Sequence, residues 1–207
     1  MRTCLSLTRV VALAFVLSCV AFVSGRALAA EEMKPIPAAE AEKRTVETRD
    51  FLLDLIAGQI DTFWHAGNWA ECVRLLRRDI ELDPHDTNAY TDLGWVLANM
   101  NRDAEAVAVF RAGIEANPKS FDIYHHLGLL YQRRGKYSEA VEQFRLAAKN
   151  GAPRAWQHML PGTLEKAGRK QEALDEWREL LKRFPNDPVA KQHIKQLEGE
   201  LEKGQPV

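Results

Sequence analysis

The sequence predicts an all-α fold, a solenoid in which antiparallel helix pairs stack and a last helix closes the stack. The first observation is a period of 34 residues, which separates Leu93 from Leu127 and Ala106 from Ala140. The second is that each period contains two amphipathic runs with helical spacing. The third is a helix-breaking residue between the two runs. A fixed period of this size is typical of stacked supersecondary units, which present long concave binding surfaces.

The two central units, 87–120 and 121–153, define the pattern. In the first of them, Tyr90, Leu93 and Leu97 share one helical face, and Asn101 is expected to end that helix. A second apolar run then follows from Ala106. The next unit repeats this arrangement with Tyr124, Leu127, Tyr131, Gly135, Ala140, Val141, Phe144 and Ala147. Small residues at Gly94 and Ala106, and at Gly128 and Ala140, predict a close approach of the two helices in each unit.

Weaker copies flank these two units. Unit 53–86 has the apolar faces Ile56-Ile60-Phe63 and Cys72-Leu76-Ile80, but Gln59-Ile60 stands where the two central units have Leu-Gly. Unit 154–187 retains Ala173 and Trp177, and the unit before it is one residue short.

Pro161 lies inside the first helix expected for unit 154–187. Proline removes a backbone hydrogen bond and clashes with the preceding turn, so we expect a kink or break near 158–161. This break either reshapes the end of a binding groove or reflects drift of a terminal unit.

The last run, 187–203, has no partner helix after it. Asp187 is a good N-cap and Pro188 a good first helical residue. Because Val189, Ala190, Ile194, Leu197 and Leu201 form a single apolar stripe, this run is expected to be a capping helix with one solvated face.

The pattern resembles the tetratricopeptide repeat (TPR) family. The matching residues are Tyr90, Leu93, Gly94, Leu97, Ala106, Phe110 and Pro118, then Tyr124, Leu127, Gly128, Tyr131, Ala140 and Phe144. The resemblance implies a right-handed superhelical solenoid of about four repeats within residues 51–207. The alternative is a generic antiparallel bundle whose periodicity is accidental.

The N-terminal residues 1–29 have the features of an export signal. Arg2 and Arg9 precede an apolar run over 10–23, and Ala27-Leu28-Ala29 fits the small-x-small cleavage pattern. The alternative is a retained membrane anchor, although the run is shorter than the ~20 residues that a spanning helix needs. Residues 30–50 form a charged linker whose second half, from Ala38, is open to helix extension.

Charge argues against a nucleic-acid binder, and the cysteine content rules out an internal disulfide. Removal of the signal leaves 25 basic and 29 acidic residues, without the basic excess of a nucleic-acid binder. Cys72 is then the only cysteine, so no internal disulfide forms, and we expect its thiol to be buried.

No motif for catalysis or for a cofactor is present. The sequence has no glycine-rich phosphate loop, no Gly-x-Ser-x-Gly, no His-Glu-x-x-His and no Cys-x-x-Cys. We therefore expect a non-enzymatic protein without cofactors. His125 and His158 occupy equivalent places in neighbouring units, but no histidine pair on one helix face supports a metal site.

The resemblance implies that particular places in the first helix of each repeat line the concave groove. Those places hold Asp54, Asp61, Trp64, Asn88, Thr91, Trp95, Asp122, His125, Leu129, Gln132, His158 and Glu165. Two tryptophans flanked by acids are typical of a strip that anchors a basic or amide-rich peptide. The alternative is that Trp64 and Trp95 only pack between helices.

One activity of the resembled family is excluded by charge. Some members hold the carboxylate terminus of a chaperone with lysine, asparagine and arginine at fixed places. Here those places hold Ala57, Asp61, Asp92, Asp122 and His126, and the three acids would repel a carboxylate.

The sequence therefore predicts an exported interaction module or assembly scaffold, expected in a bacterial periplasm, that binds a protein or peptide on its concave face. One alternative is a membrane-anchored assembly factor that keeps its N-terminal helix. Another is a helical protein that binds a small ligand or metal. Homo-oligomerisation stays open.

Overall fold

The computed structural model describes residues 37–203. The predicted export signal and most of the linker before Ala38 lie outside these residues. The chain divides into two units between Val46 and Glu47, and the predicted repeats belong to the second unit.

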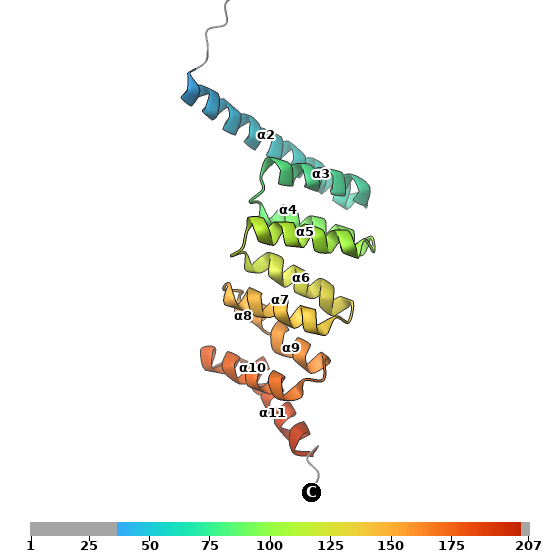
Figure 1. The fold of residues 1–207 in the computed structure, drawn as a ribbon, viewed down its shortest axis with the longest axis vertical. Coiled ribbons are helices and arrows are strands. Elements are labelled where there is room, and N and C mark those ends of the chain that lie inside the picture. The colour runs from blue at the N-terminus through green and yellow to red at the C-terminus, as the bar shows by residue number, and fades with distance from the viewer. Residues whose placement is uncertain (1–36, 204–207) are drawn as a thin grey trace, which may run out of the picture. The chain divides into compact units, whose positions relative to one another are not determined.

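The regular elements of the described residues are all helices (Figure 1). In chain order they are α2 (Ala38–His65), α3 (Trp69–Leu82), α4 (Thr87–Asn99), α5 (Asp103–Ala116), α6 (Phe121–Arg133), α7 (Tyr137–Lys149), α8 (Arg154–Gln157), α9 (Met159–Lys166), α10 (Lys170–Arg183) and α11 (Pro188–Lys203). None of the helices between residues 37 and 203 combines the length and the apolar character needed to cross a bilayer.

The helices of the second unit pack as consecutive pairs. Helix α4 packs on α5, α6 on α7, and α9 on α10, while α11 packs on α10 at the C-terminal end. Contacts of α4 with α6 and of α7 with α9 join one pair to the next, in the order seen in Figure 1. The predicted all-α stack of helix pairs is confirmed.

Within each central pair, a glycine lets an aromatic ring approach the backbone of the first helix. A Cβ atom added to Gly128 would lie 2.6 Å from Cε1 of Phe144, and one added to Gly94 would overlap the Phe110 ring. The rings themselves are only 2 % exposed. Gly94 and Gly128 of the sequence pattern therefore mark close contacts between paired helices.

The predicted helix breakers occupy the turns between paired helices. Asn101 has a φ of 59° and Gly135 a φ of 72°, both in the left-handed region that commonly ends helices. Gly67 and Gly168 hold the corresponding turns after α2 and α9.

The first helix of unit 154–187 is broken, as Pro161 predicted. Helix α8 ends at Gln157 and α9 begins at Met159, with His158 between them. Pro161 lies in the first turn of α9, where a backbone N–H has no intrahelical acceptor, so the missing donor is tolerated there.

The capping helix begins as the sequence predicts. One carboxylate oxygen of Asp187 accepts hydrogen bonds from the backbone N–H groups of Val189 and Ala190, at 2.9 and 3.1 Å. The other lies 2.8 Å from Nε2 of His158. Asp187 therefore ties the cap to the broken fourth unit, and the N-cap prediction is confirmed.

The Gly128→Ala substitution tests the close helix approach. The added methyl group would push Phe144 out of its packed position, so we expect the free energy of unfolding to fall by about 2 kcal/mol. Urea denaturation measures this difference.

Gly58→Ala is the matched control, because no heavy atom lies within 4 Å of a Cβ added at this position in α2. Alanine favours a helix over glycine, so this variant is expected to be up to about 1 kcal/mol more stable than the wild type. Equal effects of the two substitutions would contradict the packing argument.

Candidate functional site

Three tryptophans gather where the first two helix pairs meet. The rings of Trp64 in α2 and Trp95 in α4 stack with centroids 5.1 Å apart, and Trp69 of α3 meets both edge-on. Trp95 nevertheless remains 41 % exposed. The tryptophans thus pack between helices and also present aromatic surface to solvent.

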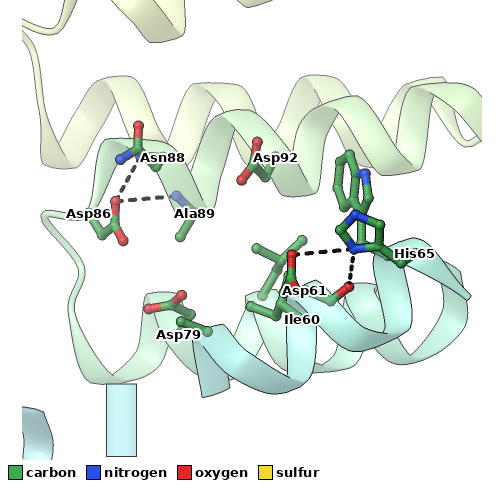
Figure 2. Close-up of a pocket in the computed structure, with 11 residues that line it drawn as sticks. Ile60, Asp61, His65, Asp79, Asp86, Asn88, Ala89 and Asp92 are labelled. Carbon is green, nitrogen blue, oxygen red and sulfur yellow. Dashed lines mark hydrogen bonds and ion pairs between the residues drawn. The ribbon is translucent and has the colours of Figure 1, made fainter. Parts of the chain in front are cut away.

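An open pocket of about 410 Å³, here called the acidic pocket, lies beside Trp64 (Figure 2). It is formed by residues of α2, α3 and α4 and of the turn before α4. Four aspartates from these segments surround it: Asp61, Asp79, Asp86 and Asp92. Its remaining lining is Ala57, Ile60, Trp64, His65, Leu76, Asn88 and Ala89.

Two of the four carboxylates have partners within the pocket. Asp86 is the N-cap of α4 and accepts hydrogen bonds from the backbone N–H groups of Asn88 and Ala89, at 2.8 and 3.3 Å. Asp61 lies 3.3 Å from Nδ1 of His65, one turn further along α2. Figure 2 shows both interactions as dashed lines.

Asp79 differs from the other three acids because its side chain is buried without a partner. The residue is only 9 % exposed, and within the described part of the chain no group forms a hydrogen bond or ion pair with its carboxylate. Burial, followed by the negative charges of Asp86, Asp83 and Asp92, raises the pKa of Asp79 to about 6.

Asp79 was not among the groove residues predicted from the sequence, because those were assigned only to the first helix of each repeat. A signal is nevertheless present in the sequence. Asp79 interrupts the apolar face that Cys72, Leu76 and Ile80 form on the second helix, where an acid is unfavourable unless it has a role.

A second hollow, here called the apolar pocket, has a volume of about 220 Å³ and includes Trp95 in its lining. Leu129 and Gln132 of α6, both predicted groove residues, line it together with His126. Its other lining residues are Ala98, Phe110, Leu130 and Arg133. Trp95 therefore stacks on Trp64, which lines the acidic pocket, and Trp95 itself lines the apolar pocket.

The structure places Thr91 and His125 in buried positions rather than at an open surface. They are 5 % and 6 % exposed, and the His125 ring stacks on Trp156 at a centroid distance of 4.1 Å. Burial and the neighbouring His126 lower the pKa of His125 to about 4. Asp122 pairs with His126 at 3.3 Å.

The predicted residues of the fourth unit form contacts within the protein. His158 contacts Asp187, and Glu165 accepts a hydrogen bond from Nε1 of Trp177 at 2.6 Å while lying 2.8 Å from His193. Asp54 is exposed on α2 but lines neither pocket. The predicted residues that the structure brings together are therefore Asp61, Trp64 and Asn88 on one side of Trp95, and Leu129 and Gln132 on the other.

The Asp79→Asn substitution tests the electrostatic state of the acidic pocket. The folded pKa of Asp79 lies above its ordinary value of 3.8, so the folded protein holds a proton that the unfolded chain releases. The carboxylate therefore lowers stability as the pH rises from about 4 to about 6, and the penalty is fully present above that range. We expect Asp79→Asn to raise the free energy of unfolding by about 2 kcal/mol at pH 7.5 and to change it little at pH 4.

Urea denaturation at both pH values measures this effect. Asp175→Asn is the control, because the Asp175 side chain is 59 % exposed on α10 and should show little change at either pH. A less stable Asp79→Asn protein at pH 7.5 would mean that the carboxylate has a favourable partner.

Comparison with known proteins identifies the repeat. Models described as tetratricopeptide repeat match residues 58–121, 109–142 and 163–187. The comparison with curated proteins found no match.

Several solved structures share the fold at low sequence identity. MamA superposes with a TM-score of 0.57 at 15 % identity, covering 72 % of this chain and 82 % of its own. For pilF of Pseudomonas aeruginosa the TM-score is 0.56 at 17 % identity, with 77 % of this chain and 71 % of that chain covered. A tetratricopeptide repeat protein from Parabacteroides merdae superposes with a TM-score of 0.58 at 12 % identity. The match covers 72 % of this chain and 61 % of that chain.

The paired helices, the contacts between glycine and an aromatic ring within the two central pairs, and the matches to three repeat models lead to one conclusion: the chain belongs to the tetratricopeptide repeat family.

Proposed function

We propose that this chain is an exported, non-enzymatic interaction module that holds a segment of a partner protein. The segment would run from the acidic pocket, across Trp64 and Trp95, to the apolar pocket. The observation that carries the proposal is the exposure of Trp95 at this position. Stacked helical repeats bind partners on extended surfaces of this kind.

The chemistry of the surface supports a polypeptide partner. Exposed aromatic rings supply much of the binding energy in protein interfaces, because they bury a large area at a small loss of conformational entropy. The acidic and apolar pockets, which lie beside the stacked rings of Trp64 and Trp95, suit consecutive side chains of a peptide. The described residues contain no group of three or more His, Cys, Asp or Glu side chains arranged to hold a metal ion.

Export rests on the sequence of residues 1–29, with its positive start, apolar run and cleavage pattern. We propose the bacterial periplasm as the location. In that compartment the repeats would act as an assembly scaffold that joins envelope proteins. Binding of a second copy of the same chain is another arrangement that the surface allows.

The Trp95→Ala substitution tests the groove. Removing the ring deletes the exposed aromatic surface that lines the apolar pocket and stacks on Trp64 of the acidic pocket. We therefore expect at least a tenfold loss of partner recovered from native envelope extract, which corresponds to about 1.4 kcal/mol of binding free energy. Quantitative mass spectrometry of the captured proteins measures the loss, and it also shows whether the partner is a second copy of the chain.

The matched control is Leu146→Ala, which removes a partly exposed apolar side chain from α7 outside both pockets. This variant should recover the same partners as the wild type. If Trp95→Ala also recovers them in equal amounts, the groove assignment is wrong.

The native N-terminus tests export. Cleavage after Ala29 should leave Ala30 as the first residue of the mature protein, and mass spectrometry of protein isolated from its own cells detects this directly. A protein that keeps residues 10–23 and is found in the membrane fraction would instead be the anchored assembly factor.

A further inference from the structure

We propose that the acidic pocket binds the basic side chain, lysine or arginine, of a partner polypeptide, with Asp79 as the residue at the buried end of the pocket. The inference rests on the proposed function and names the chemistry of the segment that is bound. It draws on the charge of the lining, the state of Asp79 and the apolar character of the remaining walls.

Acidic side chains dominate the charged lining of the pocket. It contains Asp61, Asp79, Asp86 and Asp92, and neither lysine nor arginine is among the residues that surround the pocket. His65 is the one lining residue able to carry a positive charge, and it already lies against Asp61 at the exposed rim. A cation entering the pocket would therefore be attracted from several sides.

Asp79 gives the pocket a specific receptor for a cation. Asp79 is nine-tenths buried and its carboxylate has no hydrogen-bond partner in the described chain, so the carboxylate has lost most of its solvation without gaining a compensating contact, while it still lines the open pocket. An ammonium or guanidinium group donates strong hydrogen bonds to carboxylates, so its arrival would supply the partner that the folded chain lacks. Asp86 and Asp92 from α4 and its N-cap would face the same charge (Figure 2).

The other walls suit the stem of a long basic side chain. Ala57, Ile60, Leu76 and Ala89 are apolar, and Trp64 offers an aromatic surface. Lysine and arginine bury their methylene groups along apolar surfaces while their charge reaches polar groups. A bare divalent cation lacks such a stem, and in the part of the chain that is described the acids do not form a metal-binding group.

The experiment uses the full chain and a panel of synthetic peptides, acetyl-Gly-Ser-X-Leu-Ser-Gly-amide, in which X is lysine, arginine, norleucine or glutamate. Isotope-edited NMR titration gives the dissociation constants. We expect the lysine or arginine peptide to bind about tenfold or more tightly than the norleucine peptide, because norleucine keeps the apolar stem and removes the charge. The glutamate peptide should show no binding.

Asp79→Asn should weaken binding of the basic peptide by about tenfold, which is the range expected for one charge-assisted hydrogen bond. Asp175→Asn should leave it unchanged. A loss of folding does not explain weaker binding by Asp79→Asn, because this variant is expected to be the more stable protein. A second readout is the carboxyl carbon of Asp79: its pKa should fall from about 6 when the lysine peptide is bound, because a nearby cation favours the charged carboxylate.

Three results would overturn the inference. They are equal affinity for the lysine and norleucine peptides, unchanged affinity of Asp79→Asn for the basic peptide, and displacement of that peptide by millimolar calcium with calcium bound at Asp79. If Trp95→Ala loses the native partner while Asp79→Asn retains it fully, the inference fails and the proposed function stands. If both variants retain the partner, the proposed function fails as well.

Discussion

The close approach of the two helices within each central repeat is the constraint on which the rest of the structure depends. Phe110 and Phe144 each occupy the space that a side chain on the facing helix would need, and glycine at 94 and 128 leaves that space open. Because this contact fixes one helix against the other, it also fixes which face of α4 and of α6 is left uncovered. The exposed position of Trp95 follows from that geometry, since it is adjacent in sequence to the buried Gly94.

The two ends of the repeat array differ in how their first helices are used. In the first two pairs, the first helices contribute Trp64 and Trp95 to an open surface. In the fourth unit, the corresponding polar residues are taken up by contacts inside the protein, because His158 contacts Asp187 and Glu165 contacts Trp177 and His193. The break at His158 belongs to this closed end, where side chains of the fourth unit bind the capping helix. The same places of the repeat therefore face an open surface in one part of the stack and form contacts within the protein in another.

Most of the fold could be predicted from the sequence, because the signals were local. The breakers Asn101 and Gly135, the interruption by Pro161 and the cap at Asp187 each act within a few residues of their own position. The period of 34 residues repeats such local patterns along the chain. The candidate site could be predicted less completely. The groove-lining places of the family pointed to Trp64, Trp95 and Leu129. They could not show that Thr91 is buried or that Trp156 stacks on His125. Asp79 was missed because its role depends on the space between three helices, which no single helical face reveals.

The unpartnered state of Asp79 also has a meaning for how the chain behaves in a cell. A fold in which every local preference agrees has little frustration, and Asp79 is a place where the preference for a buried apolar residue is not met. Residues of this kind commonly mark a compromise between stability and activity. For this chain, occupancy of the acidic pocket and folding would be thermodynamically linked. A group that neutralises the carboxylate of Asp79 would also stabilise the native state. Free and bound molecules would then differ in their lifetime against proteolysis, and the amount of this protein would follow the supply of its partner.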